Sequence, residues 1–350
     1  MTLFQHKKVS LQYILFEVTQ QCNLSCLYCY NHWKRDGNNN ILKSSYEQSI
    51  KTLRKLFKTA SVKHVTFTGG EPLLTKRIQE LVLFCRMKGS TVSVITNGNT
   101  GSQEDFSHLI NIGVQVFELP LHSPTPAGHD HMTGKEGSWQ NSLNTMHFLT
   151  QKEGTVVPVI VVTKINYNKV GETLMFLQSN GFSRIMLNWY NIGGPGLLFP
   201  EIIVPTSEEL NEAFFQANEM VKKLGLVISS NVCTPHCVVD PLKYRHITFT
   251  NCSTNLMQRP LTLTATGDMR FCNHSPTVLG NIFKTSVNQI LDEGSDFEIM
   301  NNTPEFCAGC SRYDKCLGGC RAAAEQAGKT FFDVDPLALN FDVKNHIKSA

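Results

Sequence analysis

Short hydrophobic runs rich in β-branched residues alternate with longer amphipathic stretches between about residues 12 and 190. The strand-like runs are residues 13–18, 62–68, 92–96, 114–121, 156–162 and 184–190. The helix-like stretches, with apolar positions three and four apart, include residues 45–59, 75–88, 138–151 and 169–180. Strands that are apolar nearly throughout are typical of a parallel sheet covered by helices. The pattern predicts an α/β fold with six β/α repeats, and by itself it fits both an incomplete barrel and an open doubly wound sheet.

A segment rich in glycine and proline, residues 191–205, follows the last repeat and is interpreted as a boundary. Residues 206–224 then read as one amphipathic helix with Thr206 or Ser207 as its N-cap. Beyond it lie short strand-like runs, turns and many of the cysteines. We therefore expect residues 1–200 to form the β/α unit and residues 201–350 to form a smaller, cysteine-rich α+β unit.

Charge and hydropathy exclude several function classes. The chain has 350 residues, 41% of them hydrophobic, and a formal charge of +3, which provides no strong field to attract nucleic acid. Its basic run Lys51, Arg54, Lys55 and Lys58 is interpreted as the solvent-exposed face of a helix. Residues 11–18 are too few and too polar for a signal or membrane segment. We expect a cytoplasmic protein that binds neither nucleic acid nor membrane.

Three of the twelve cysteines, Cys22, Cys26 and Cys29, follow the first strand in a Cys-x3-Cys-x2-Cys array. Without an export signal, metal ligation explains so many cysteines better than disulfides do. Three close thiolates can bind three irons of a cubane and leave the fourth open, whereas a structural zinc site takes four ligands, usually as two pairs. An open iron suits the amino and carboxylate groups of S-adenosylmethionine (SAM). A zinc or redox loop with a borrowed ligand is the alternative.

This array, its place after the first strand and the aromatic Tyr28 before the third cysteine resemble the radical SAM superfamily. The resemblance implies a partial (β/α)6 TIM-like barrel in which the three cysteines bind a 4Fe–4S cluster and Tyr28 lies against the adenine of SAM. It implies reductive cleavage of SAM to a 5′-deoxyadenosyl radical, which abstracts hydrogen from a substrate. An electron donor such as flavodoxin or ferredoxin would be a partner.

Two segments at the ends of the second and third strands strengthen the resemblance. One resembles the superfamily's Gly-Gly-Glu-Pro motif, whose backbone and acidic group hold the methionyl ammonium, and the other resembles a segment near the SAM ribose. Glycine would let the backbone approach the ligand, and a turn into a helix is equally compatible. The carboxyl ends of parallel strands are where such folds place their chemistry. The candidate SAM contacts are Gly69, Gly70, Glu71, Pro72, Thr96 and Asn97.

His122, His129 and His131 follow the fourth strand and suggest a second metal site. A His-Asp pair, here His129 and Asp130, is common in this loop among radical SAM relatives with cysteine-rich tails. We therefore favour a structural loop or a substrate contact. Cys85 lies in a helical apolar stripe and is interpreted as a buried hydrophobe.

The later cysteines resemble the SPASM domain, an extension of radical SAM enzymes that carries auxiliary clusters. The spacings are Cys252-x14-Gly267-x4-Cys272 and Cys307-x2-Cys310-x5-Cys316-x3-Cys320. The resemblance implies an inner auxiliary cluster at Cys252, Cys272 and Cys320, and an outer one at Cys307, Cys310 and Cys316. Because Cys-x2-Cys pairs are common in zinc sites, zinc in this tail is the alternative.

Both auxiliary sets need a fourth ligand. Cys233, Cys237 and His246 are the candidates for the inner set, and Cys237 is our first choice. The family has a seventh cysteine that would complete the outer set, and this sequence has none after Cys320.

The outer cluster would then use Asp333 or Asp335, leave one iron open, or be absent. One or two auxiliary clusters are therefore expected beside the SAM-binding one.

These features predict a radical SAM enzyme that modifies a peptide or protein. A dehydrogenase or epimerase acting on a small molecule is the alternative, and a non-catalytic iron–sulfur or zinc scaffold or sensor is a lower one. No catalytic residue is identified; Cys233 is a speculative hydrogen donor for an epimerase if it is not a ligand. Because the first strand comes so early, we expect a separate partner protein or the barrel itself to recognise a peptide leader.

Overall fold

The computed structural model describes residues 8–35, 44–253, 255–295 and 302–339. Its strands are β1 (Val9–Thr19), β2 (Ala60–Gly69), β3 (Thr91–Ile95), β4 (Val114–Pro120), β5 (Val156–Val162), β6 (Arg184–Trp189), β7 (Val227–Ser230), β8 (Ile247–Phe249), β9 (Pro260–Thr264), β10 (Asp268–Arg270) and β11 (Val278–Asn281). Its α-helices are α1 (Tyr46–Thr59), α2 (Ile78–Met87), α3 (Gln103–Asn111), α4 (Pro126–Thr133), α5 (Ser138–Gln151), α6 (Val170–Ser179), α7 (Pro200–Ile203), α8 (Ser207–Leu224), α9 (Val287–Ser295), α10 (Tyr313–Cys316) and α11 (Arg321–Gln326). The six predicted strands are all present.

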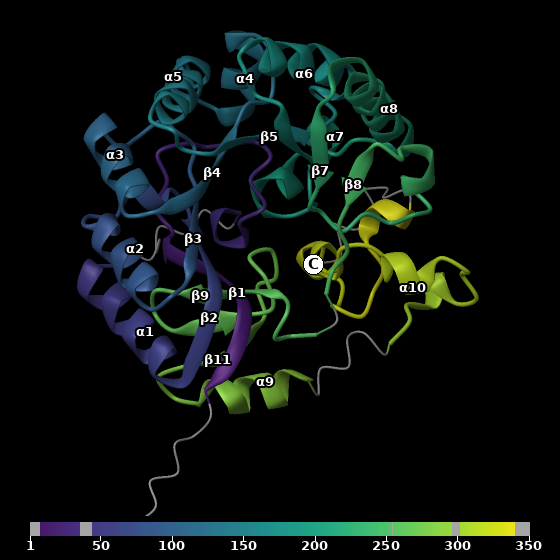
Figure 1. Ribbon diagram of the computed structural model, residues 1–350. Coiled ribbons are helices and arrows are strands. Elements are labelled where there is room, and N and C mark those ends of the chain that lie inside the picture. The colour runs from purple at the N-terminus through teal and green to yellow at the C-terminus, as the bar shows by residue number, and fades with distance from the viewer. Residues whose placement is uncertain (1–7, 36–43, 254, 296–301, 340–350) are drawn as a thin grey trace, which may run out of the picture.

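The described strands form one 11-stranded sheet in the order β11-β10-β9-β1-β2-β3-β4-β5-β6-β7-β8. From β9 to β8 every neighbouring pair is parallel, and β10 and β11 add an antiparallel hairpin at one edge. The sheet curves without closing, and helices α1 to α6 and α8 form an arc outside it (Figure 1). The structure is therefore an incomplete β/α barrel, the first of the two folds that fit the sequence pattern.

Residue alternation gives the strands an apolar outer face and a more polar inner face. Phe16, Phe67 and Phe117 are fully buried in the core, and the rings of Phe16 and Phe67 meet edge to face at 5.7 Å. Successive residues of a strand point to opposite faces, so Glu17 and Glu118 face the inside of the curved sheet. A carboxylate on this inner face can meet a substrate, whereas the phenylalanines fix the position of the helices.

Local capping explains where the long helices begin and end. The Ser45 hydroxyl accepts a hydrogen bond from the amide of Gln48 at the start of α1. Thr206 and Glu209 form a reciprocal capping box at the start of α8, which confirms Thr206 as the N-cap. Gly225 ends α8 in the left-handed conformation that favours glycine.

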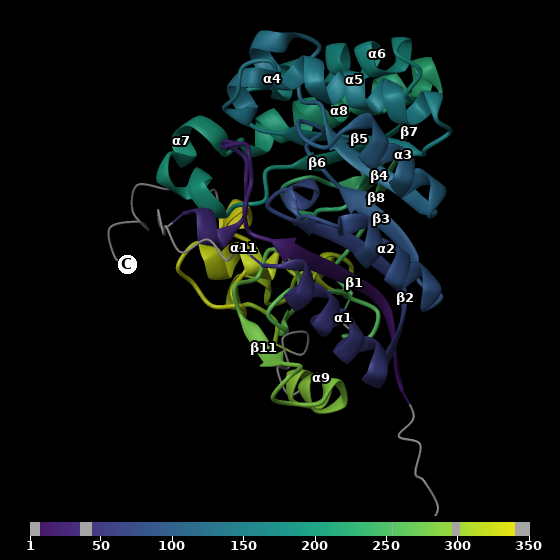
Figure 2. The same cartoon turned by 90° about the vertical axis from the view of Figure 1, so that its left-hand side faces the viewer.

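The chain beyond residue 200 continues the same sheet at both edges. β9 pairs with β1, and β7 and β8 extend the sheet from β6. On the outer side of β1, the Thr52 hydroxyl of α1 donates to the carbonyl of Ala265 at 2.5 Å. An ion pair joins Glu17 of β1 to Arg270 of β10, and both side chains are only 3% exposed. Figures 1 and 2 both show α9 and β11 beside α1 and β1.

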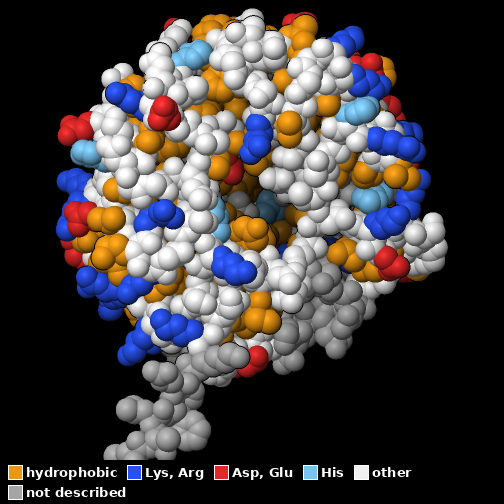
Figure 3. Space-filling model, viewed as in Figure 1, with side chains coloured by type: hydrophobic (Ala, Val, Ile, Leu, Met, Phe, Trp, Pro, Cys, Tyr) orange, Lys and Arg blue, Asp and Glu red, His pale blue; other side chains and the backbone are white. Residues whose placement is uncertain are grey.

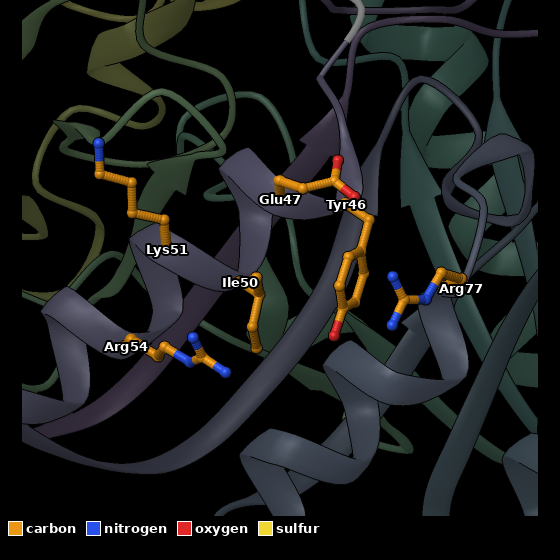
Figure 4. Close-up of a pocket in the computed structure, with 6 residues that line it drawn as sticks. All are labelled: Tyr46, Glu47, Ile50, Lys51, Arg54 and Arg77. Carbon is orange, nitrogen blue, oxygen red and sulfur yellow. The ribbon is translucent and has the colours of Figure 1, made fainter.

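The surface is hollowed at the centre of the face shown in Figure 3, where hydrophobic, acidic and histidine side chains lie inside the opening. A separate groove lies on the outside, between α1 and the start of α2 (Figure 4). Lys51, Arg54 and Arg77 line it, and the Arg77 guanidinium stacks 3.7 Å from the Tyr46 ring centroid. Within the described ranges, no helix has the length and apolar character to cross a membrane.

Replacing Phe67 with Ala should cost about 3–5 kcal/mol of unfolding free energy, because it leaves a cavity under the helices. Phe215→Ala is the matched control, since the Phe215 ring is 58% exposed, and it should change stability little. Urea unfolding of both variants, followed by circular dichroism, measures the difference. Equal losses of stability in the two variants would contradict the assignment of Phe67 to the core.

Candidate functional site

The first three cysteines lie together on the loop that follows β1. Cys29 donates its amide to the carbonyl of Cys26 at 3.2 Å, and Leu27 is tied to Met132 through a 2.9 Å backbone bond. Burial, together with the charges of Cys29 and Cys22, raises the pKa of Cys26 to about 12. The charges of Cys22 and Cys29 act on Cys26, so the three thiols are near one another. The structure therefore brings the predicted trio together.

Lys34 stands beside this trio and was not predicted from the sequence. Its ammonium donates to the carbonyl of Leu24 at 3.2 Å. Burial opposes its charge, but the thiolates of Cys29, Cys22 and Cys26 outweigh burial and raise the pKa of Lys34. Three thiolates in a partly buried loop need a nearby cation to offset their charge. In the sequence, the only sign of this role was that Lys34 follows the third cysteine by five residues.

The two glycines at the end of β2, Gly69 and Gly70, pack against the backbone that leads into the cysteine loop. Gly70 donates its amide to the carbonyl of Thr19 at 2.8 Å, and Gly69 has a φ of +130°, where side chains are strained. A Cβ on Gly69 would overlap the carbonyl of Thr19, and one on Gly70 would overlap that of Gln21. We expected glycine here because the backbone approaches a ligand. The structure gives a further reason, because the backbone also approaches the segment that leads into the cysteine loop.

Glu71 ties β2 to the loop after β3. It is fully buried, and burial raises its pKa to about 7, while the hydrogen bonds that it accepts act in the opposite direction. Its carboxylate accepts from the Thr96 hydroxyl at 2.7 Å, the Asn97 amide at 2.8 Å and the Leu73 amide at 3.0 Å. Three internal donors occupy the carboxylate that we expected to hold the methionyl ammonium. Glu71 therefore holds the neighbouring loops in place, and Pro72 starts the short 3-10 helix of residues 72–74.

Asn97 connects this network to the cysteine loop. Its side-chain amide donates to Asn23 at 2.8 Å and lies 4.0 Å from the sulfur of Cys22. The candidate residues at the ends of β1, β2 and β3 are thus in one continuous contact network. Their direct contacts with SAM remain a prediction.

Tyr28 lies against a histidine pair. Its ring meets that of His122 edge to face at 4.3 Å, and His122 stacks on His129 at 5.3 Å. The Nδ1 atom of His122 accepts the amide of Val161 at 3.1 Å, and the Nδ1 atom of His129 accepts the amide of His122 at 3.2 Å. Each imidazole is thus a buried acceptor for backbone, and burial lowers the pKa of His129 to about 4.

Asp130 caps α5 by accepting the amides of Gly137 and Trp139, both at 2.7 Å, and His131 is exposed. These contacts fit the structural interpretation of the loop. Elsewhere, Cys85 is fully buried in the core, as expected.

A second set of thiols joins Cys233, Cys252, Cys272 and Cys320. A hydrogen bond with Cys252, burial and the charges of Cys252 and Cys320 raise the pKa of Cys233. Burial raises the pKa of Cys272, with Arg259 opposing and Cys252 adding to the effect. This is the predicted inner set, and Cys233 occupies the place that we expected Cys237 to take.

A third set joins Cys237 to Cys307, Cys310 and Cys316. Burial, followed by the charges of Cys316 and Cys310, raises the pKa of Cys237. Burial and the charges of Cys316, Cys237 and Cys310 raise the pKa of Cys307, while Arg321 opposes the shift. Cys237 therefore lies with the outer cysteines and not with the inner ones. The sequence offered no signal for this exchange, because the two candidates are only four residues apart.

Tyr30 and Gln326 connect the first cysteine loop to the inner set. Asn273, next to Cys272, donates its side-chain amide to the Tyr30 hydroxyl. Gln326 donates to the carbonyls of Tyr30 at 2.9 Å and His274 at 2.7 Å. These contacts fix the C-terminal unit against the loop that follows β1.

All twelve cysteines fall within the described part of the chain, and all are free. Among the described residues, no three His, Cys, Asp or Glu side chains are arranged as ligands around a single metal ion. Within each of the three sets, the cysteines act electrostatically on one another, and backbone contacts surround them.

The Radical SAM superfamily model matches residues 16–177, which contain the end of β1, strands β2 to β5, the first cysteine loop and the Glu71 network. This part of the chain is therefore a radical SAM domain. Members of this superfamily use a 4Fe–4S cluster and SAM.

Curated relatives extend the similarity to nearly the whole chain. A PqqA peptide cyclase of Xanthomonas campestris pv. campestris is 26% identical over 340 residues, which cover 93% of this chain and 85% of the cyclase. A PqqA peptide cyclase of Methylocella silvestris is 24% identical and covers 89% of this chain and 83% of the cyclase.

Solved structures share the fold. Native anSMEcpe with bound AdoMet superposes with a TM-score of 0.73 at 15% identity, covering 96% of this chain and 95% of that one. Streptococcus suis SuiB bound to precursor peptide SuiA superposes with a TM-score of 0.71 at 16% identity, covering 94% of this chain and 75% of SuiB. The incomplete barrel with its C-terminal extension is therefore a fold that these two solved proteins share.

The first cysteine set of this radical SAM protein fits a cluster with one open iron. Three thiols are candidate ligands on one loop, and Lys34 balances part of their charge. Soft thiolates are the ligands that iron–sulfur clusters take. The network through Glu71 and Asn97 fixes the backbone next to these thiols, which is where SAM would bind.

Gly70→Ala should weaken SAM binding at least about tenfold, which corresponds to about 1.4 kcal/mol, because its Cβ would displace the cysteine loop. The matched control is Gly171→Ala in α6, where a Cβ would make only an ordinary 3.4 Å contact with Gln216. Equilibrium binding of SAM to anaerobically reconstituted protein measures the effect. Wild-type affinity in Gly70→Ala would show that the close backbone contact does not position the site.

Proposed function

We propose that this radical SAM enzyme modifies a peptide or protein substrate. The observation that carries the proposal is the cysteine trio after β1, held by the Gly69–Gly70 contact and the Glu71 network. Support for a peptide substrate comes from the similarity to PqqA peptide cyclases along 93% of the chain and from the fold shared with SuiB bound to its precursor peptide. The inner and outer thiol sets would hold auxiliary clusters.

The chain's own residues place and shield the reaction. When bound, the reduced cluster and SAM supply reductive cleavage to a carbon radical that takes hydrogen from the substrate. Gly69, Gly70 and Glu71 fix the loop that bears the ligands, and Lys34 offsets its negative charge. Tyr30 contacts Asn273, and the buried Glu17–Arg270 pair joins β1 to β10, so both contacts tie the first half of the chain to its C-terminal part.

Glu118 is the candidate for proton transfer within the barrel. It lies near the end of β4 on the inner face, and burial raises its pKa to about 7. Its charge also contributes to the raised pKa of Tyr30, so the two groups lie near each other. A carboxyl group with this pKa can accept a proton from a substrate at neutral pH.

The proposal extends to the protein's partners and location. A small reduced carrier such as flavodoxin or ferredoxin would donate the electron. A cytoplasmic location would keep the twelve cysteines reduced until clusters are inserted.

Anaerobic reconstitution with iron, sulfide, SAM and dithionite should give 5′-deoxyadenosine. Cys26→Ala should lower its formation at least about 100-fold, because the cluster loses one of three ligands. Cys85→Ala, which truncates a buried cysteine in the core, is the matched control and should retain the activity. Zinc in the first site of the loaded protein, or undiminished cleavage by Cys26→Ala, would overturn the assignment.

The substrate is tested with peptides encoded next to the gene, deuterated at candidate positions. Transfer of deuterium into 5′-deoxyadenosine, with a mass change in the peptide, is the expected result. Deuterium transfer from small metabolites only would replace the peptide proposal with a small-molecule dehydrogenase or epimerase.

Glu118→Gln should lower product formation at least about tenfold, as expected for loss of a general base. In the wild type, the rate should rise as pH increases through about 7, because the carboxylate must be deprotonated to act, and this rise should vanish in the variant. Glu104→Gln on the surface of α3 is the control. An unchanged pH profile in Glu118→Gln would exclude this role.

A further inference from the structure

We infer that the loop between β7 and β8 supplies one thiolate to each auxiliary cluster: Cys233 completes the inner set and Cys237 completes the outer set. This inference deepens the proposed function and rests on it. In place of the seventh cysteine of the SPASM pattern, the outer set would use Cys237, which precedes all the cysteines of that pattern in the sequence.

The loop has a fixed conformation around the two cysteines. The carbonyl of Pro235 accepts the amides of Val238 at 2.9 Å and Val239 at 3.1 Å, which forms a turn around Cys237. The indole of Trp189 donates to the Thr234 hydroxyl at 2.9 Å, and both side chains are buried. Cys233 and Cys237 therefore lie on opposite sides of an anchored segment.

Arg312 joins this turn to the outer cysteine loop. Its guanidinium donates to the carbonyl of His236 at 3.3 Å and pairs with Asp240 at 2.9 Å. Arg312 lies between Cys310 and Cys316, so the two bonds hold both sides of Cys237 to the segment that carries the other outer thiols. Salt bridges of partly exposed groups add little stability, but two contacts from one guanidinium fix the position of the turn relative to the outer cysteine loop.

A second contact holds the other end of the turn. Gly319 has a φ of +80°, and a Cβ built on it would lie 2.6 Å from Pro235 and 2.7 Å from Asp335. Only glycine lets the segment between Cys316 and Cys320 approach the turn so closely. The approach brings Cys237 to Cys307, Cys310 and Cys316, in agreement with the charges that these thiols exert on one another.

The two acidic alternatives for the outer ligand are already engaged. Asp335 is fully buried, and its two carboxylate oxygens accept the amides of Cys320 at 2.9 Å and Leu337 at 3.0 Å. Asp333 accepts the amide and hydroxyl of Thr330, both at 2.8 Å. Both carboxylates thus serve as turn caps, which leaves Cys237 as the soft ligand beside the outer set.

The inner set has its own fourth thiol in Cys233. Its hydrogen bond with Cys252 and the guanidinium of Arg259 beside both place it among buried thiols. Arg259 is only 3% exposed, and thiolates near it raise its pKa although burial acts against its charge. Four thiols and one buried cation form a suitable donor set for a negatively charged cluster.

Thiol footprinting tests the assignment of Cys237 directly. Cys237 is exposed, so iodoacetamide should alkylate it readily in protein without clusters. After anaerobic reconstitution, its alkylation should slow at least about 100-fold, because a sulfur bound to iron is no longer a free nucleophile. Ser311→Cys provides a matched reporter at an exposed, non-ligand position next to Cys310, and its alkylation should not slow.

Mass spectrometry of the labelled peptides gives the rate at each cysteine. Alkylation of Cys237 in the reconstituted protein at the rate measured without clusters would overturn the inference. Equal slowing at the Ser311→Cys reporter would also overturn it, because the protection would then reflect general occlusion.

Substitution gives an independent readout. Cys237→Ala should lose about four of about twelve irons per chain or give an outer iron with a non-cysteine ligand in Mössbauer spectra. Asp333→Asn should retain the wild-type iron content and spectrum. Wild-type spectra in Cys237→Ala, or iron loss in Asp333→Asn alone, would reject Cys237 as the ligand. Failure of the proposed function would appear separately, as absence of SAM cleavage by the unmodified protein.

Discussion

The close contact between the backbone after β2 and the backbone after β1 determines the geometry of the first site. Gly69 and Gly70 lie where any Cβ would overlap Thr19 or Gln21, so β2 and the root of the cysteine loop can meet without intervening side chains. Glu71 continues this contact to β3 by accepting donors from Thr96 and Asn97. A buried carboxylate with three donors is well satisfied, and removing any one donor leaves it partly uncompensated. The position of the cysteine trio therefore depends on backbone packing and on one buried acid, and the protein makes both sets of contacts without a bound cofactor.

The C-terminal unit depends on similar close contacts. β9 joins the free edge of β1, the buried Glu17–Arg270 pair fixes β10 to the same strand, and Gln326 ties the last helix to Tyr30. Tyr30 thereby lies near both the first trio and the inner thiols, because the charges of Cys29 and Cys272 both act on it. The loop between β7 and β8 then connects inner and outer sets, because Cys233 faces one and Cys237 the other.

The parts that the sequence predicted are those with local signals. The six strands follow from runs of β-branched residues, a cap at Thr206 or Ser207 from the N-cap preference of these residue types, and the cysteine trio from spacing within eight residues. The parts that it missed depend on tertiary contacts. Whether Cys233 or Cys237 joins the inner set is decided by Arg312 and Gly319, which lie far along the chain. A motif does not show that three internal donors surround the Glu71 carboxylate, and Lys34 has meaning only beside the folded trio.

The central claim is that Cys22, Cys26 and Cys29 leave one iron open for SAM. Electron paramagnetic resonance of the reduced protein, with Cys252 and Cys307 replaced by Ala to remove the auxiliary signals, tests it most directly. We predict a four-iron signal whose g values change when SAM is added, because the amino and carboxylate groups would bind the open iron. A signal that does not respond to saturating SAM, or a first site that takes up no iron, would contradict the account.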